Sequence, residues 1–367
     1  MKLLFQQSEL LKSVNISMKA VSSRSTLPIL ECILIDATAN EIKLLSNDTE
    51  LAIETIVPGE ILEKGTIAIE AKTFSEIIRR LPNSQVTLET DEKSIVHIRC
   101  EKAKFDIPGR SGDDFTALPI VERESSISIT QFSLKQIINQ TIFSIATNEN
   151  NKLMTGELFE IRNNQLRVVS LDGHRIAIRN LALKDECPDQ KVVVPGKTLN
   201  EISRILDGGT EDLVTLSFSK NHMIFEFGVT TVVTRLIDGE YFNISQMLSN
   251  DYETKIKVNK NELISCINRA SLLVRESDKM PVVINLSEGT LDLSIDTSMG
   301  SMDEQLEIQM EGKDIRIGFN PKFLIDALRV IEDEEVTIYF ISPITPCYIR
   351  DDAQSYTYLI LPVNISR

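Results

Sequence analysis

The sequence predicts an α+β fold in which one domain, an antiparallel sheet with two helices on one face, occurs three times in tandem. Short motifs recur with a period close to 124 residues, each repeat holds two helical segments, and short alternating strands follow each helix. The length of 367 residues allows about two or three domains of ordinary size. Because the period is so long, we expect tandem globular domains and not a solenoid of short repeats.

Three motifs carry the repeat and keep their order along the chain. They are a Ser-x-Asp turn, then a helix with an acidic residue three positions before Arg, then a Val-Thr-Leu or Val-Thr-Ile strand. The three motifs occur, repeat by repeat, at 46–48, 74–81 and 86–88, at 170–172, 199–206 and 214–216, and at 294–296, 324–331 and 336–338. Polar or turn-like stretches separate the repeats, which predicts domains at 1–122, 123–250 and 251–367.

The helices are expected where apolar residues recur at the helical period. These segments are 8–20, 72–81, 132–146, 197–206, 260–275 and 321–331. Alternating segments such as 41–44 and 96–99 are typical of half-buried strands. Tryptophan is absent and aromatic residues make up 5%, so the cores must consist mainly of Ile, Leu and Val.

Cysteine usage and hydropathy indicate a reducing compartment. The five cysteines are scattered, odd in number and contain no CxxC pair, which argues against a disulfide framework or a zinc site. The apolar N-terminal segment is too short for a signal peptide, and no apolar run approaches the roughly 18 residues of a membrane helix. We therefore expect a cytoplasmic protein that does not contact membranes.

The net charge of −15 is unevenly distributed. The six helical segments carry 13 Lys or Arg against 5 Asp or Glu, a net charge of +8 that leaves −23 for the rest of the chain. One interpretation is that Lys and Arg simply cover solvated helix faces. The other is that all six helices line one positive surface that contacts phosphates without reading bases, since no recognition-helix motif is present. Such contacts would be weak and salt-sensitive, so enclosure would be needed to keep the protein on DNA.

Two motifs have the appearance of catalytic or phosphate-binding sites. Asp172-Gly173-His174 could serve acid–base chemistry, but its aspartate recurs in the other repeats without the histidine, so a turn explains it better. The segment 195–198, Pro-Gly-Lys-Thr, lacks the first glycine of a P-loop because Lys191 stands there. Without an identifiable nucleophile or a clustered set of metal ligands, we expect neither catalysis nor a cofactor or metal.

Several segments resemble one bacterial family over the full length of the chain. They are Arg24 to Leu30 (Arg-Ser-Thr-Leu-Pro-Ile-Leu), Asp172 to Ala177 (Asp-Gly-His-Arg-Ile-Ala), Leu206 to Gly209 (Leu-Asp-Gly-Gly) and Tyr358 to Pro362 (Tyr-Leu-Ile-Leu-Pro). In these the chain is similar to the DNA polymerase III β subunits, the sliding clamps. The resemblance implies three DNA-clamp domains per chain and a head-to-tail homodimer that forms a six-domain ring around duplex DNA, with helices inside.

The resemblance also implies residues for DNA and for ring closure. The expected contacts to duplex DNA, which would not depend on sequence, are Arg24, Lys72, Arg79, Lys197 and Arg204, whereas Leu153 replaces an aromatic residue that stacks near DNA in some relatives. The expected dimer interface joins Phe105 and Ile107 of the first domain to Leu272 and Leu273 of the partner's third domain. The charges that flank this joint are complementary: Lys102 and Lys104 on one side, and Asp303, Glu304 and Glu307 on the other.

The family binds short, apolar-ended peptide motifs between the second and third domains. The matching positions here are Met154, Leu171, Gly173, His174, Arg175, Ile176, Phe242, Met247, Leu359, Leu361, Pro362 and Val363. Apolar strand ends beside a glycine turn and methionines favour an adaptable groove, with a nearby cation to fix peptide polarity. Two departures affect its shape: Phe242 replaces a proline common in the family, and the tail extends past the usual end to Arg367.

The resemblance therefore implies a non-catalytic processivity factor. Its implied partners are DNA polymerase III alpha, clamp-loader subunits, other polymerases and repair proteins. Two alternatives remain open at the level of sequence. One is a protein-only adaptor that uses the C-terminal groove without encircling DNA, and the other is an enzyme with a site near Asp172 and His174.

Overall fold

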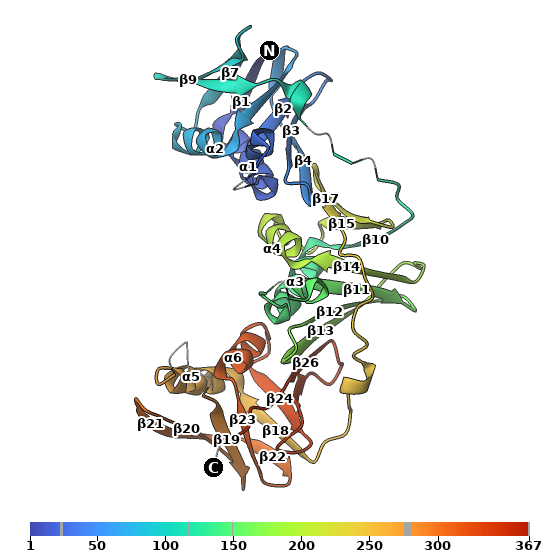
Figure 1. Cartoon of the computed structure of the whole chain (residues 1–367), viewed down its shortest axis with the longest axis vertical. Coiled ribbons are helices and arrows are strands. Elements are labelled where there is room, and N and C mark those ends of the chain that lie inside the picture. The colour runs from blue at the N-terminus through green and yellow to red at the C-terminus, as the bar shows by residue number, and fades with distance from the viewer. Residues whose placement is uncertain (23–24, 116–117, 120, 149, 275–279, 366–367) are drawn as a thin grey trace. The chain divides into compact units, whose positions relative to one another are not determined.

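The computed structural model describes residues 1–22, 25–115, 118–119, 121–148, 150–274 and 280–365 (Figure 1). The chain forms two compact units. The first unit consists of Met1–Leu134 and Glu201–Leu236, and the second of Lys135–Asn200 and Ile237–Arg367. The middle repeat is therefore divided between the two units.

Six α-helices occur in the described residues, two in each repeat. They are α1 (Gln7–Ser17), α2 (Ala71–Arg80), α3 (Gln131–Thr141), α4 (Gly196–Ile205), α5 (Lys260–Ser271) and α6 (Pro321–Arg329). Six short 3-10 helices accompany them: η1 (Met18–Ala20), η2 (Pro28–Glu31), η3 (Gly112–Asp114), η4 (Ile142–Ser144), η5 (Lys152–Thr155) and η6 (Ser245–Met247). The prediction of six helical segments is confirmed, with ends that differ by a few residues. Among the described helices, none has the length and apolarity to cross a membrane.

The second helix of the outer repeats begins at a side chain that caps it. Glu70 accepts hydrogen bonds from the backbone N–H groups of Lys72 and Thr73, at 3.1 and 2.6 Å. Asn320 accepts one from the backbone N–H of Lys322 at 2.9 Å, and Pro321 follows it at the first helical position. Both caps satisfy N–H groups that have no partner inside the helix, which fixes where each helix begins.

The first unit contains one 13-stranded sheet in which every neighbouring pair is antiparallel. Its strands, in spatial order, are β10 (Ser125–Thr130), β15 (Leu213–Phe218), β16 (His222–Phe227), β17 (Thr230–Arg235), β4 (Leu51–Val57), β3 (Ile42–Asn47), β2 (Cys32–Asp36), β6 (Thr66–Glu70), β9 (Ala103–Arg110), β8 (Ile95–Cys100), β7 (Gln85–Thr90), β1 (Lys2–Gln6) and β5 (Glu60–Glu63). The pairing of β17 with β4 continues the sheet from the first repeat into the second.

Helices α1 and α2 lie side by side and cover this sheet in the first repeat (Figure 1). Leu10 and Val14 of α1 and Phe74 and Ile78 of α2 are fully buried in one cluster with the inward side chains of the strands. Burial of such apolar side chains is the main stabilising contribution to a layer of this kind. This is the predicted arrangement of two helices on one face of an antiparallel sheet.

The second unit contains two antiparallel sheets. The nine-stranded sheet has the order β14 (Gln190–Pro195), β11 (Gly156–Arg162), β12 (Gln165–Leu171), β13 (Arg175–Ala182), β26 (Tyr356–Ile360), β25 (Cys347–Arg350), β24 (Glu335–Phe340), β18 (Thr254–Asn259) and β22 (Gln309–Gly312). The four-stranded sheet has the order β21 (Gly300–Glu307), β20 (Thr290–Thr297), β19 (Val282–Ser287) and β23 (Ile315–Phe319). The pairing of β13 with β26 continues a sheet from the second repeat into the third, as β4 and β17 do in the first unit.

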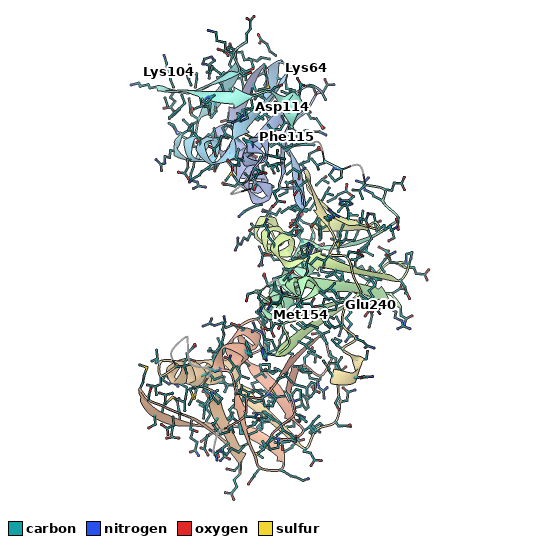
Figure 2. All side chains as sticks on the ribbon, viewed as in Figure 1. Lys64, Lys104, Asp114, Phe115, Met154 and Glu240 are labelled. Carbon is teal, nitrogen blue, oxygen red and sulfur yellow. The ribbon has the colours of Figure 1, made fainter. Side chains whose placement is uncertain are left out.

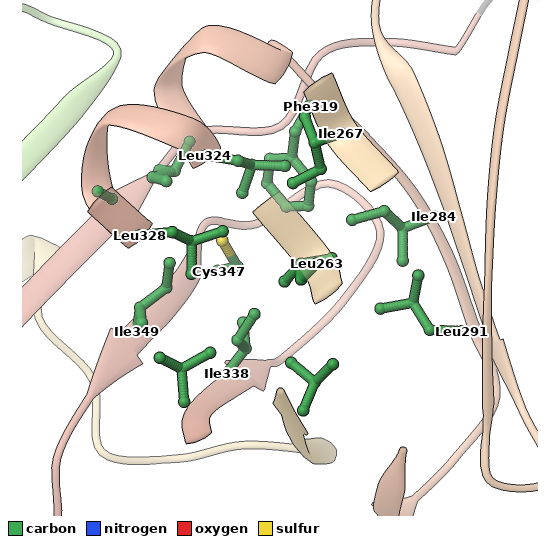
Figure 3. Packing of buried hydrophobic residues seen from close by; sticks show 14 of the residues in the cluster. Leu263, Ile267, Ile284, Leu291, Phe319, Leu324, Leu328, Ile338, Cys347 and Ile349 are labelled. Atoms are coloured by element: carbon green, nitrogen blue, oxygen red, sulfur yellow. The ribbon is translucent and has the colours of Figure 1, made fainter. Parts of the chain in front are cut away.

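The core of the third repeat lies between α5, α6 and the surrounding strands (Figure 3). Leu263 and Ile267 of α5 meet Leu324 and Leu328 of α6, and Phe319 packs beside them. All five side chains are at most 2% exposed. Aliphatic residues dominate this cluster, as the composition predicts.

Repeated residues also make repeated hydrogen bonds. Ser46 donates its hydroxyl to the backbone carbonyl of Ser17, and Ser170 donates to that of Thr141, both at 2.6 Å. Each bond fixes the end of the first helix of its repeat to the strand beneath. The recurring serine is thus a structural element of the repeat.

One acidic side chain is buried in the sheet of the second unit. Glu157 on β11 is fully buried, and Thr141 donates its hydroxyl to Glu157 Oε2 at 3.1 Å. Among the described residues, the second oxygen, Oε1, has no hydrogen-bond partner. Burial outweighs the Thr141 bond and raises the pKa of Glu157 to about 8. The side chain is therefore held as a neutral acid at neutral pH.

We expect Glu157 to make folding stability fall as the pH rises. The unfolded chain loses this proton near the ordinary pKa of 4.5, whereas the folded chain keeps it until about pH 8. The contribution is thus complete below pH 4.5 and is lost progressively up to about pH 8. Glu157→Gln should flatten this dependence in urea titrations followed by circular dichroism.

The control is Glu160→Gln, because Glu160 lies on the same strand but is partly exposed. Its pH dependence should parallel that of the parent. Equal slopes for the parent and Glu157→Gln would show that Glu157 ionises without cost in the folded protein.

Candidate functional site

The residues expected to form a peptide groove lie together in the second unit. Five of them, Met154, Leu171, Ile176, Phe242 and Leu359, belong to one apolar cluster that backs the end of β13 and β26. Leu171, Ile176 and Leu359 are buried, whereas Met154 and Phe242 are only partly buried. The cluster therefore combines buried side chains with partly accessible ones.

The rim of this cluster carries exposed groups. Met247 is 57% exposed and Leu361 is 38% exposed, so two large apolar side chains of this set face solvent. Gly173 and His174 are also exposed, and Pro362 is half-buried. We call these residues, with Arg175, Val363 and the cluster above, the groove, after the peptide groove that the sequence predicts.

A turn at the start of β13 gives the groove its shape. Asp172 Oδ1 accepts hydrogen bonds from the backbone N–H groups of His174 and Arg175, at 2.9 and 3.2 Å. Gly173, which lies between Asp172 and His174, has φ +89°, a conformation that favours glycine. The backbone N–H of Leu361 donates to the carbonyl of His174 at 2.9 Å, which joins the chain end to the turn. The aspartate of this motif therefore has a structural role.

Arg175, the cation expected beside the groove, is paired within the chain. Its side chain is 8% exposed, and its nitrogens donate to Asp172 Oδ2 at 2.9 Å, Asp326 Oδ2 at 2.8 Å and the carbonyl of Phe143 at 2.5 Å. The guanidinium also lies over the ring of Phe323, 4.5 Å from its centroid. A cation with these partners is held within the chain, where it positions the turn.

Two residues that sequence reasoning missed hold the segment that carries Met247. Tyr348 donates its hydroxyl to the carbonyl of Met247 at 2.8 Å. Arg350 donates to the carbonyl of Ser249 at 3.0 Å and to Asn250 Oδ1 at 2.9 Å. An arginine inside the buried strand Cys347–Arg350 was a signal for a paired cation, but the sequence does not reveal its partners one hundred residues away.

The extended tail runs along β23. The backbone N–H of Val363 donates to the carbonyl of Gly318 at 2.8 Å. A side chain at Gly318 would meet Ile365 Cγ1 at 2.9 Å, so this glycine allows the tail to lie close. The end of the chain up to Ile365 therefore lies beside β23, while Ser366 and Arg367 are outside the described residues.

The expected DNA contacts are basic and exposed where the structure describes them. Lys72 and Arg79 lie on α2, Lys197 and Arg204 lie on α4, and Arg24 is outside the described residues. Arg79 donates to Glu76 at 2.9 Å and Arg204 to Glu201 at 3.0 Å. Exposed pairs of this kind contribute little, so either arginine can exchange its carboxylate for a phosphate.

Leu153, which replaces the aromatic residue, faces the groove cluster. It packs against that cluster and against the backbone of Gly239, where an added Cβ would lie 3.2 Å from Leu153 Cδ2. Its side chain thus has a packing role in the structure.

The first half of the expected interface lies on β9. Phe105 is 38% exposed, whereas Ile107 is half-buried against the core of the first repeat. Among the described residues, Ala103 to Pro108 pair with β8 alone, which leaves the other side of this strand without a partner strand. Lys102 and Lys104 are exposed at its outer end, from which Lys104 extends away from the sheet (Figure 2).

The second half lies at the end of α5 and on β21. Leu272 is 76% exposed and Leu273 is half-buried against the core of the third repeat. Strand β21 is the edge of the four-stranded sheet and exposes Asp303 and Glu307. Arg269 of α5 donates to both carboxylate oxygens of Glu304, which lowers the pKa of Glu304 and partly neutralises it. Arg269 therefore pairs with only one of the three acidic residues that are expected to face lysines. Asp303 and Glu307 do not pair with it.

The motifs that look catalytic have structural explanations. His174 stacks on Phe323 with 6.0 Å between ring centroids, and Asp172 is occupied by the turn. Gly196 begins α4, where an added Cβ would lie 2.4 Å from Ile145 Cδ1 and 2.8 Å from the carbonyl of Thr155, so packing requires this glycine. Within the described part of the chain, no cluster of three His, Cys, Asp or Glu side chains could hold a metal ion.

Comparisons with known proteins agree with this organisation. The chain matches the N-terminal, central and C-terminal domains of the DNA polymerase III beta subunit family at residues 1–119, 128–243 and 245–364. It is 33% identical to a protein named beta sliding clamp from Staphylococcus epidermidis, over 99% of both chains.

Solved structures give the same result. A putative DNA polymerase III beta subunit from Eubacterium rectale is 59% identical and superposes with a TM-score of 0.96, covering 100% of this chain and 99% of that one. The DNA polymerase sliding clamp from Bacillus subtilis is 33% identical with a TM-score of 0.95, over 100% of both chains. The chain therefore belongs to the DNA polymerase III beta subunit family.

Proposed function

We propose that this protein is a sliding clamp, a ring of two chains joined head to tail that encircles duplex DNA and tethers a DNA polymerase to it. The observation that carries the proposal is likeness to proteins named beta sliding clamp over 99% of both chains. The protein has no catalytic chemistry of its own in this proposal and acts in the bacterial cytoplasm. The domains are taken as 1–122, 123–250 and 251–367.

The distribution of charge supports encirclement. The helices carry the exposed cations Lys72, Arg79, Lys197 and Arg204, whereas the whole chain has a net charge of −15. Contacts from such residues reach the phosphates of any sequence and weaken steeply with salt. A ring held on DNA by topology would combine this weak contact with long residence.

The two edge strands support ring closure. The unpaired side of β9 and the edge strand β21 are of the kind that add to one another across an interface. Phe105 and Leu272 supply exposed apolar surface, and lysines on one side match Asp303 and Glu307 on the other. Two different patches that meet in this way generate a closed ring when the rotation between subunits permits it.

The groove supports the tethering of protein partners. Its apolar floor and exposed Met247 and Leu361 suit a short extended peptide with apolar side chains at its end. Such peptides would come from polymerase III alpha, the clamp loader, other polymerases and repair proteins. A protein-only adaptor would use the same groove, so the topology of DNA binding distinguishes the two functions.

Retention on DNA should depend on whether the DNA is closed. After loading by the cognate clamp loader, the protein should stay on a nicked circular plasmid through gel filtration in moderate salt. Cutting the circle once should release it, because a ring slides off a free end. Retention that is the same before and after cutting, or no retention on the circle, would favour the adaptor.

The dimer should separate when both halves of the interface carry a charge. Ile107→Asp combined with Leu273→Asp buries carboxylates without partners, which costs several kcal/mol. Sedimentation velocity should then report the mass of one chain. Leu213→Asp is the control, because Leu213 is 59% exposed on another strand, and it should leave the dimer intact. Dimers in the double variant would exclude this joint.

Peptide binding should depend on the apolar rim of the groove. A fluorescein-labelled pentapeptide that ends in two leucines should bind the parent, and Leu361→Asp should weaken it at least tenfold in fluorescence polarisation, about 1.4 kcal/mol or more. Leu62→Asp is the matched control, because Leu62 is 48% exposed and lies in the first unit, whereas the groove lies in the second. Equal affinity for the parent and Leu361→Asp would remove Leu361 from the site.

A further inference from the structure

The turn before β4 in the first unit has the same geometry as the turn before β13. Asp48 Oδ1 accepts hydrogen bonds from the backbone N–H groups of Glu50 and Leu51, at 3.1 and 2.8 Å. Asp172, 124 residues later, makes the corresponding two bonds. The repeat thus places two equivalent turns at the two places where a sheet continues from one repeat into the next.

The strand beside each turn is attached in the same way. The backbone N–H of Arg235 donates to the carbonyl of Glu50 at 2.9 Å, as that of Leu361 donates to the carbonyl of His174 at 2.9 Å. The registers of the two strand pairs, β4 with β17 and β13 with β26, therefore align Arg235 with Leu361.

The middle residue of the first turn adopts a costly conformation. Thr49 has φ +78°, close to the +89° of Gly173 at the equivalent position. A β-branched residue with positive φ is an outlier, and such strain is concentrated at functional sites. Glycine would adopt this conformation without strain; here the backbone N–H of Thr49 donates to Asn47 Oδ1 at 2.7 Å, which helps to hold it.

A pocket of about 450 Å³ opens at this turn, within the size range of ligand sites. Leu51, Ala52 and Val233 supply apolar surface, and Asn47 and Asn221 add amide groups. All lie in the first unit, which makes the pocket a feature of that unit alone.

The chemistry of this pocket differs from that of the groove at each equivalent position. Asn47 stands where the groove has Leu171, Glu50 where it has His174, Ala52 where it has Ile176, and Arg235 where it has Leu361. The floor of this pocket is thus lower than the corresponding part of the groove, because alanine replaces isoleucine. The rim of the pocket is charged.

Arg235 is the cation available to a ligand here. It is exposed, and its guanidinium has no hydrogen-bond or ion-pair partner among the described residues. Burial first, and then the charge of Arg235, lowers the pKa of the neighbouring His222, which is therefore neutral at pH 7. Glu50 is exposed on the same rim, and its negative charge would repel a polyanion such as a nucleic-acid backbone.

We infer that this pocket is a second peptide-docking site, which takes a short segment with one apolar side chain followed by an acidic residue. The apolar side chain would lie over Ala52 and Val233, and the carboxylate would pair with Arg235 in the two-bond geometry that guanidinium groups favour. The inference does not rest on DNA encirclement, and it concerns partners whose motif differs from the apolar-ended peptides of the groove.

The test uses two labelled, C-terminally amidated pentapeptides. They differ only in whether one side chain ends in a carboxylate or in an amide. Fluorescein-Gly-Ser-Leu-Asp-Gly should bind the full-length protein, and the same peptide with asparagine in place of aspartate should bind at least tenfold more weakly. Arg235→Glu should abolish binding of the acidic peptide, and Arg235→Lys should retain part of it. Ala52→Leu should weaken it by filling the floor.

Two further variants separate this site from others. Arg316→Glu makes the same charge change at an exposed arginine in the second unit and should leave binding intact. Leu361→Asp should also leave the acidic peptide bound. The inference is overturned if the acidic peptide fails to bind at millimolar concentration, if both peptides bind equally, or if Arg235→Glu binds like the parent with an unchanged melting curve.

Discussion

Main-chain hydrogen bonds that cross from one repeat to the next are the constraint on which the rest of this structure depends. In each unit one strand of a repeat pairs antiparallel with one strand of its neighbour, β4 with β17 and β13 with β26. Each pairing fixes the register of two domains to within a residue, since a slip by one would turn every inward side chain outward. Asp48 and Asp172 both lie at these junctions between repeats, which we call seams, and so do the pocket beside Asp48 and the groove residues beside Asp172.

A seam is a suitable place for a binding site because it combines rigidity with variety. Asp48 and Asp172 each accept the same pair of backbone hydrogen bonds, so the recurring aspartate sets the frame at both turns. The side chains around the frame are free to change, which is how one seam carries Leu361 and the other Arg235. One fold can in this way offer two surfaces of opposite chemistry.

The described cations are also arranged so that they remain available. Arg79 and Arg204 each contact a glutamate three residues earlier on the same helix, and both are more than half exposed. Such pairs keep the arginines ordered at little energetic cost and release them to a stronger anion. Arg175, by contrast, is buried and bonded at three nitrogens, and it serves the fold.

Much of the fold follows from the sequence because its signals are local. The helix motifs at 74–81, 199–206 and 324–331 and the Ser-x-Asp turns are read within ten residues, and the structure confirms the helices they predict. The set of groove residues came from the family resemblance, and five of its members lie in one cluster.

The remainder depends on contacts between residues far apart in the chain. Arg175 finds Asp326 across 151 positions, and Tyr348 and Arg350 hold a segment about one hundred residues earlier. Neither the neutral state of Glu157 nor the pocket beside Arg235 has a local signal. Both are created by strands that the fold brings together.

The division of the middle repeat between two compact units has a consequence for how this chain can be cut. Its strand β17 completes a sheet with the first repeat, and its strand β13 completes a sheet with the third. A fragment that contained the middle repeat alone would therefore expose two long rows of unsatisfied backbone amides and carbonyls. Such a fragment would be prone to self-association through its open strands, whereas cuts that keep each seam with both of its strands would not create new edges.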